Sequence, residues 1–205
     1  MTSVTVVVLG QNLRTITVEE FIVAGFFKKL FGGNTDSAEA PAQAPASPSG
    51  TSCQLTAPLT GTVVALAEVS DQMFASGALG PGAAVEPTAG IVVAPADGEV
   101  TVAFPTGHAF GLRTDDGLEI LIHVGFDTVE LDGKFFNPQV KKGDRVTRGQ
   151  VLVEFDLDQV KAAGYHVTTP LVVTNAKNTV ADLQVAGVGQ AVTAGGDFVT
   201  VLRQG

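Results

Sequence analysis

The sequence predicts an all-β fold: an antiparallel β-sandwich or barrel-like single domain with short helices, preceded by an N-terminal helix and a flexible tether. From residue 53 onward, short runs rich in Val, Thr, Ile and Phe are separated by Gly, Pro and Asp, with little helical periodicity. The segment "APLTGTVV" at 57–64 returns as "APADGEVT" at 94–101, which predicts two related β-hairpin units about a pseudo-symmetric core. "VKKGDRVTRGQVLVEFD" at 140–156 adds a Gly-Asp turn and two further strands.

One short helix is expected inside this domain. The segment "DLDQVKAAG" at 156–164 has the composition of a helix, and Asp158 is the residue we expect to cap it. His166 follows the helix and is expected to have a structural role.

Two segments precede the β domain. Residues 34–52, "NTDSAEAPAQAPASPSGTS", are rich in Ala, Pro and Ser and lack periodicity, as a solvated linker does. Residues 1–33 form an N-terminal extension in which a capping box and a Gly-Gly stop predict an amphipathic helix over 17–31. The expected division of the chain is therefore 1–33, 34–52 and a domain at 53–205.

The predicted helix at 17–31 raises the question of membrane contact. It is too short to span a bilayer, but Lys28 and Lys29 beside three Phe residues suit shallow interfacial binding. Packing on a neighbouring domain is an equal alternative. The sequence shows neither a cleavable leader nor about 18 uninterrupted apolar residues. We therefore expect a cytoplasmic protein, with peripheral contact to the inner face of the cell membrane through residues 17–31 as an option.

Charge and cysteine content narrow the classes of partner. A net charge of −9 and an isoelectric point near 4.6 argue against nucleic acid and favour a basic protein partner. Cys53, the single cysteine of the chain, has no internal disulfide partner and is expected to be an ordinary exposed thiol. The spacing of His and Cys fits no zinc site.

The informative stretch is "LIHVGFDTVEL" at 121–131, which puts His123 in an apolar strand. Apolar residues alternate from 118 to 124 on one face, so His123 points to the other face. A turn within 114–117 would fold this strand back on the alternating run that contains His108. A two-residue turn would place His108 diagonal to His123, roughly 7–8 Å apart at Cβ, and a four-residue loop would place the two directly opposite. An odd-length loop would separate them.

Paired histidines suit proton or phosphoryl chemistry. A neutral imidazole nitrogen is a competent nucleophile, and phosphoryl transfer mainly requires positioning and neutralisation of the oxygens. Gly107 and Gly125 lack side chains beside the rings and would let backbone N–H groups approach an anion. The alternative is that each ring is a satisfied histidine of the sheet without a chemical role.

Several long motifs resemble one family. "DQMFASGALGPGAAVEPTAG", "VVAPADGEVTVAFPTGHAFGL" and "GLEILIHVGFDTVELDGKFF" are similar to the glucose-type enzyme IIA component of the bacterial phosphoenolpyruvate-dependent sugar phosphotransferase system, over about 55–200. The resemblance implies that His123 accepts a phosphoryl group from phospho-HPr, as tele-phosphohistidine, and passes it to a cysteine of the IIB domain of a sugar permease. It implies that His108 stabilises that group and that Thr106 hydrogen-bonds His108. The uptake served would be of the glucose, glucoside or N-acetylglucosamine type.

The resemblance also implies a docking face for HPr and IIB. Its apolar residues would be Met73, Phe74, Leu79, Phe104 and Leu121. Asp71 and Asp127 stand at positions that meet arginines of HPr, which agrees with the acidic balance of the chain. Some of these apolar residues could instead belong to the core.

Other functions remain as alternatives. A biotinyl or lipoyl carrier shares the hairpin pattern but needs a modifiable lysine at a hairpin tip, typically Met-Lys-Met, which the sequence lacks. A zinc endopeptidase of related architecture needs a His-x-His pair, which the sequence also lacks. No cofactor is required, although His108 and His123 could bind zinc incidentally with a carboxylate from a partner. A regulatory module, whose phosphorylation state controls binding to cytosolic proteins, would keep the same fold.

Overall fold

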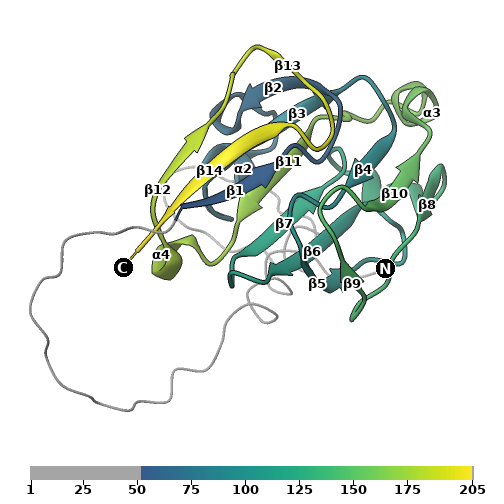
Figure 1. Cartoon of the computed structure of the whole chain (residues 1–205). Helices are drawn as coiled ribbons and strands as arrows, with labels where there is room; N and C mark the ends of the chain where they lie inside the picture. The colour runs from purple at the N-terminus through teal and green to yellow at the C-terminus, as the bar shows by residue number, and fades with distance from the viewer. Residues whose placement is uncertain (1–51, 205) are drawn as a thin grey trace, which may run out of the picture. The chain divides into compact units, whose positions relative to one another are not determined.

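The computed structural model describes residues 52–204, in which short β-strands form three antiparallel sheets (Figure 1). This confirms the predicted all-β class. The expectations for the helix at 17–31 and for most of the linker lie outside the described residues. In chain order the strands are β1 (Ser52–Thr56), β2 (Gly61–Ala65), β3 (Gly82–Pro87), β4 (Ile91–Val93), β5 (Gly98–Ala103), β6 (Ala109–Thr114), β7 (Glu119–His123), β8 (Phe136–Pro138), β9 (Arg145–Val146), β10 (Val151–Phe155), β11 (Thr169–Val173), β12 (Val180–Val185), β13 (Ala191–Val192) and β14 (Asp197–Arg203).

The helices are short and connect strands. They are η1 (Leu66–Glu68), α2 (Gln72–Ala75), η2 (Thr128–Leu131), α3 (Leu157–Ala162) and α4 (Ala176–Thr179). Within residues 52–204 no helix has the length and apolar character needed to cross a membrane. The predicted helix near 156–164 is present as α3, but its cap was predicted wrongly. Asp156, not Asp158, is the N-cap, because its side chain accepts a hydrogen bond from the Gln159 amide at 3.0 Å.

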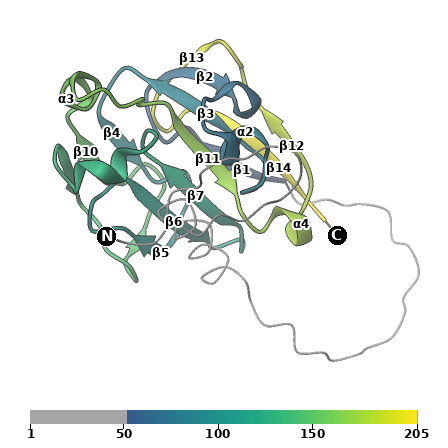
Figure 2. The ribbon, with the colours of Figure 1, turned by 180° about the vertical axis from the view of Figure 1, so that it is seen from behind.

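One large sheet dominates the fold. It has eight strands in the order β13-β2-β3-β11-β7-β6-β5-β9, and two three-stranded sheets have the orders β1-β14-β12 and β4-β10-β8. Both views place β5, β6 and β7 side by side with β11 (Figures 1 and 2). The centre of the large sheet is thus the β7–β11 pair, and His123 is the last residue of β7.

The predicted pseudo-symmetry is visible in the backbone hydrogen bonds. Ala57 exchanges hydrogen bonds of 2.8 and 2.9 Å with the Gly195–Gly196 turn, and Ala94 exchanges two of 2.8 Å with Gly149–Gln150. The edge strands β13 and β9 then pair with the equivalent strands β2 and β5. The two units also bind each other, because the Thr56 amide donates to the Pro95 carbonyl and the Val93 amide to the Pro58 carbonyl. Each repeated segment therefore forms the same corner in one half of the fold.

The apolar core confirms the predicted face of β7. Leu118, Ile120, Ile122 and Val124 all belong to it, each at most 2% exposed. Cys53 does not fit its prediction: it is 6% exposed and belongs to the same core, because the alternation of β1 directs it inward with Leu55. Its thiol donates to Asp116 at 3.2 Å, and burial, followed by this contact, raises the pKa of Cys53.

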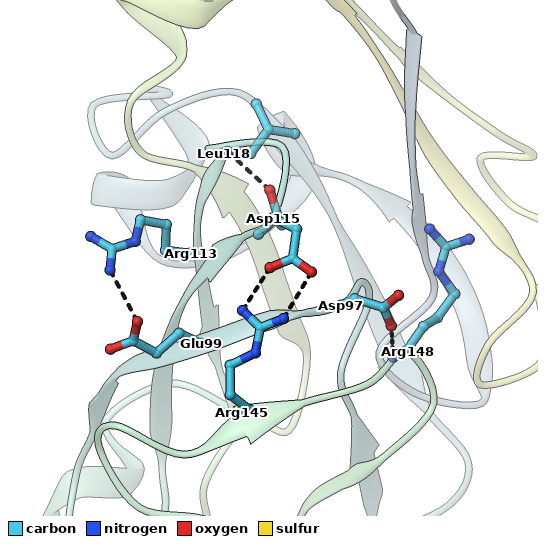
Figure 3. A network of polar contacts seen from close by, with 8 residues as sticks. Asp97, Glu99, Arg113, Asp115, Leu118, Arg145 and Arg148 are labelled. Carbon is cyan, nitrogen blue, oxygen red and sulfur yellow. Dashed lines mark hydrogen bonds and ion pairs between the residues drawn. The ribbon is translucent and has the colours of Figure 1, made fainter.

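A polar network fixes the closed end of the β6–β7 hairpin (Figure 3). Arg145 of β9 binds Asp115 with both guanidinium nitrogens, at 2.7 and 2.9 Å, and this contact lowers the pKa of Asp115. Arg113 of β6 pairs with Glu99 of β5 at 3.1 Å. These exposed ion pairs add little stability singly, but they connect the hairpin loop to its neighbouring strands. The two histidines lie at the opposite, open end of this hairpin.

Candidate functional site

The two histidine rings meet at the open end of the β6–β7 hairpin. Their centroids are 5.2 Å apart, and the ring planes form an angle of 66°. His123 ends β7, and His108 directly precedes β6. The backbone reinforces the approach, because the Val124 amide donates to the His108 carbonyl at 2.6 Å. The prediction that the rings are neighbours is confirmed.

The strand register that brings them together differs from both predicted registers. Ala109 pairs with His123 and Arg113 with Glu119, so the loop has three residues, Asp115–Gly117, with Gly117 at φ +82°. This is the odd-length loop that should separate the rings. His108 nevertheless lies beside His123, because strand alternation does not apply to it. It precedes β6 and follows a turn in which the Gly107 amide donates to the Phe104 carbonyl. The chain direction set by this turn, rather than strand alternation, brings His108 to His123.

The tautomer of His123 follows from its hydrogen bond. Nδ1 lies 2.6 Å from the Gly125 carbonyl oxygen. A carbonyl can only accept, so Nδ1 carries the proton and Nε2 keeps its lone pair. Burial lowers the pKa of His123, while the Gly125 carbonyl and then Asp71 and Asp127 act in the opposite direction. The neutral ring, with a nucleophilic Nε2, is the form that this environment favours.

His108 is the more buried ring, with 2% of its surface exposed. Burial, and then the neighbouring His123, lower its pKa to about 3. Its Nδ1 lies 2.5 Å from the Thr106 hydroxyl, and Thr106 is half-buried. His108 therefore stays neutral at physiological pH and has a fixed partner on Nδ1.

Aromatic rings surround the pair. Phe104 packs on His108 with centroids 4.9 Å apart, and Phe74 meets His123 edge-on at 5.7 Å. Phe126, which we did not single out from the sequence, packs on Phe74 at 5.8 Å and is 5% exposed. Its signal is its place in the motif "HVGFDTV", directly after Gly125 and three residues after His123. These rings give the imidazoles apolar neighbours.

The seven predicted docking residues fall into different environments. Met73 is 41% exposed, whereas Phe104 and Leu79 are half-buried and Phe74 is 4% exposed. The expectation for Leu121 is wrong: it is 1% exposed, because it pairs with Gly111 and Val172 in the middle of three neighbouring strands. Leu121 therefore supports the face from beneath and offers no surface.

Leu79 and the two aspartates show further local features. Leu79 lines a groove of about 990 Å³ between the loop after α2 and strand β12, which the histidines do not line. Asp71 caps α2, accepting from the amides of Met73 and Phe74 at 2.8 and 3.1 Å. Asp127 is exposed and has a left-handed backbone, with φ +58°, and its side chain does not cap η2.

The structure bears on two further expectations, one about anion binding by a backbone amide and one about a metal ion. The Gly107 amide is used in its own turn, so it is not available to an anion. Among residues 52–204, no group of three or more His, Cys, Asp and Glu side chains could hold a metal ion. The histidine pair alone thus provides two metal ligands at most.

Comparison with known proteins agrees with this arrangement. A family model described as "phosphoenolpyruvate-dependent sugar phosphotransferase system, EIIA 1" matches residues 53–179. The glucose-specific EIIA component of Bacillus cereus is 39% identical over 169 residues, covering 82% of this chain and 93% of that protein. The solved glucose permease IIA from Mycoplasma capricolum superimposes with a TM-score of 0.68 at 36% identity, covering 73% of this chain and 96% of that one.

Larger relatives contain the same domain. The β-glucoside-specific EIIBCA component of Halalkalibacterium halodurans is 51% identical over 124 residues, which are 60% of this chain and 20% of that protein. The chain therefore spans only about a fifth of this relative's length. The family match covers more than half of the chain and includes both histidines. The chain belongs to the EIIA 1 family of the phosphoenolpyruvate-dependent sugar phosphotransferase system.

Proposed function

We propose that this chain is a phosphocarrier in which His123 accepts a phosphoryl group from phospho-HPr and passes it to a cysteine of a IIB permease domain. The observation that carries the proposal is the Nδ1 contact of His123 with the Gly125 carbonyl at 2.6 Å, because it leaves Nε2 unprotonated. Family membership and the adjacent neutral His108 support it.

The proposed transfer exchanges one bond for another. The N–P bond of phospho-HPr breaks as a bond forms between phosphorus and Nε2 of His123. Nδ1 of His123 keeps its proton, which stays hydrogen-bonded to the Gly125 carbonyl. In the second step the Nε2–P bond breaks and an S–P bond forms with the thiolate of the IIB cysteine. The neutral ring of His123 is then restored, so the carrier returns to its starting state.

His108 is proposed to stabilise the transferred group. The Thr106 hydroxyl donates to Nδ1 of His108 in this assignment, so Nε2 of His108 carries the proton and donates to a phosphoryl oxygen. The pKa of about 3 keeps this ring neutral, so it is not a competing cation. In this tautomer Nε2 carries the proton and Nδ1 accepts from Thr106, so the ring offers no free lone pair as a competing nucleophile. Thr106 is compatible with this tautomer of His108, whereas the Gly125 carbonyl, which can only accept, fixes that of His123.

The partner surface follows from exposure and charge. Met73 and Phe104 present apolar surface near the rings, and Asp71 and Asp127 present carboxylates that would meet a basic partner. We assign this surface to phospho-HPr and to the IIB domain in turn, which places the reaction in the cytoplasm. At such an interface the two histidines and a partner carboxylate would suit an incidental zinc ion. Transfer itself requires no cofactor.

Phosphorylation would also alter the surface itself. A phosphoryl group on His123 places about two negative charges beside Phe74 and Phe104, which disfavours apolar contacts made by the unmodified face. This supports a second role in which cytosolic proteins bind the unphosphorylated form only. Membrane contact through residues 17–31 is a separate proposal that rests on the sequence pattern of that segment.

The proposal is tested by intact mass after incubation with phosphoenolpyruvate, enzyme I and HPr under alkaline conditions that preserve phosphohistidine. Wild type should gain one phosphoryl group, and His123→Ala should gain none. His108→Gln should still be phosphorylated but transfer more slowly, and His166→Ala, which changes an exposed histidine outside the pair, should behave as wild type. Phosphorylation of His123→Ala, or none on wild type, would refute the proposal.

A further inference from the structure

Thr128 lies next to the loop whose Gly125 carbonyl accepts the hydrogen bond from Nδ1 of His123. Its side chain is fully buried, at 0% exposure, and its hydroxyl donates to the Val124 carbonyl at 2.5 Å. The Val124 amide donates to the His108 carbonyl at 2.6 Å. Both backbone groups of Val124 are therefore held, one by the backbone of His108 and the other by the hydroxyl of Thr128.

The methyl group of Thr128 packs against Gly125. A Cβ added to Gly125, whose φ is +73°, would lie 2.7 Å from Cγ2 of Thr128 and 2.4 Å from the His166 carbonyl oxygen. That same carbonyl accepts from the Phe126 amide at 3.0 Å. Gly125 is thus enclosed on both sides, and the direction of its own carbonyl is set by these contacts. This carbonyl is the acceptor for Nδ1 of His123.

We propose that Thr128 is a positioning residue for the phosphoacceptor. It holds Val124 and Gly125 so that the Gly125 carbonyl keeps the proton of His123 on Nδ1 and leaves Nε2 free. The role in transfer rests on the proposed function, whereas the role in fixing the tautomer does not. Without the hydroxyl, the buried Val124 carbonyl loses its donor, and the loop relaxes toward a new partner. The Gly125 carbonyl then moves away from Nδ1, and the ring becomes a mixture of tautomers.

Three variants separate the hydroxyl from the rest of the side chain. Thr128→Val keeps the shape and removes the hydroxyl, and Thr128→Ser keeps the hydroxyl and removes the methyl group. Thr56→Val is the matched control, because Thr56 is 4% exposed and its hydroxyl donates to the Pro95 carbonyl at 3.0 Å in another part of the fold. It loses a comparable buried hydrogen bond without touching the loop.

The decisive readout is the pair of ring ¹⁵N chemical shifts of His123, measured by long-range ¹H–¹⁵N correlation in unphosphorylated protein. Wild type, Thr56→Val and Thr128→Ser should show a protonated Nδ1 and an unprotonated Nε2. In Thr128→Val the tautomer ratio should change about tenfold, as expected for one lost hydrogen bond. The rate of phosphoryl transfer from phospho-HPr should fall with the fraction of the reactive tautomer, and should be largely retained in Thr128→Ser.

Each outcome decides one of the two proposals. Wild-type ring shifts in Thr128→Val would overturn the positioning role, even if transfer were slow. Equal changes in Thr56→Val would overturn it too, since the effect would then be general destabilisation. If Thr128→Val fails to fold, Thr128→Ala against Thr128→Ser repeats the test, and alanine must shift the tautomer while serine must not. Failure of wild type to accept a phosphoryl group would refute the proposed function, and the ring shifts would still decide the role of Thr128.

Discussion

At the scale of single residues, the two histidines differ in what surrounds them. His108 is 2% exposed and has a hydroxyl on Nδ1, whereas His123 is half-buried and has a carbonyl there. A carbonyl dictates which nitrogen carries the proton, while a hydroxyl can adapt to either tautomer. His123 thus has a fixed tautomer, whereas His108 can carry its proton on either ring nitrogen.

The pKa of His108 predicts how stability depends on pH. The folded-state pKa of about 3 lies below the unfolded value near 6.5, so between these pH values the unfolded chain binds a proton that the folded chain does not. The free energy of unfolding should therefore fall as the pH decreases through this window, by about 3 kcal/mol at pH 4 from this residue. Urea unfolding of wild type and His108→Gln between pH 7 and 4 measures the effect. The variant should show the shallower dependence, and parallel curves would contradict the assignment.

Two adjacent residues of α2 should separate stability from docking. Phe74 is 4% exposed between His123 and Phe126, so Phe74→Ala should lower the free energy of unfolding by about 3 kcal/mol. Met73 is 41% exposed, so Met73→Ala should change it by no more than about 0.5 kcal/mol while raising KM for phospho-HPr. Chemical denaturation and transfer kinetics measure both. An unchanged KM in Met73→Ala would remove Met73 from the docking face.

At the scale of secondary-structure elements, α3 tests which aspartate is the cap. Asp156 accepts from the Gln159 amide, so Asp156→Ala should lower the free energy of unfolding by about 1 kcal/mol. Asp158 lies exposed in the first turn, and Asp158→Ala should cost only a few tenths of a kcal/mol. Thermal and urea unfolding compare the pair. The reverse order would mean that the cap observed here is not what stabilises the helix.

The hairpin shows how far sequence reasoning reached. Alternation of apolar residues predicted the buried face of β7 correctly, because packing in one core imposes period two. Loop length was not predictable, since Thr114–Gly117 suits turns of several lengths, and a shift of one residue moves a side chain to the other face. The position of His108 depends on the turn before β6, which strand periodicity does not describe. The tautomers depend on carbonyl and hydroxyl contacts that no sequence pattern reports.

The repeated segments show why one prediction about the elements succeeded. Gly61 and Gly98 each follow the repeated Pro turn, and a Cβ on them would lie 2.1 and 2.3 Å from a carbonyl oxygen of the next strand. Both positions therefore require glycine for the same reason of close approach. The repeat in sequence predicted a repeat in structure because the close approach of the backbones requires glycine at both positions.

At the scale of the whole molecule, the fold has two related halves, but only one of them contains the histidine pair. β7 and β11 pair at the centre of the large sheet, with Ile122 opposite Leu171, so the pseudo-two-fold axis passes between them. The position equivalent to His123 is then Val172, which is 0% exposed. The histidine pair therefore lies in only one half, at the open end of the β6–β7 hairpin. The other half supplies the second strand of the central pair and its share of the core.

We predict that residues 47–205 suffice for folding and transfer. A fragment beginning at Ser47, where the second compact unit starts, retains the core, both histidines and Thr128. Its Tm should agree with that of the full chain within about 2 °C, and it should accept one phosphoryl group at the same rate. Sedimentation with anionic lipid vesicles should separate the two proteins, because only the full chain contains residues 17–31 with Lys28 and Lys29. Equal sedimentation of both would refute the proposed membrane contact, and a fragment that folds but transfers slowly would show that residues 1–46 take part in docking.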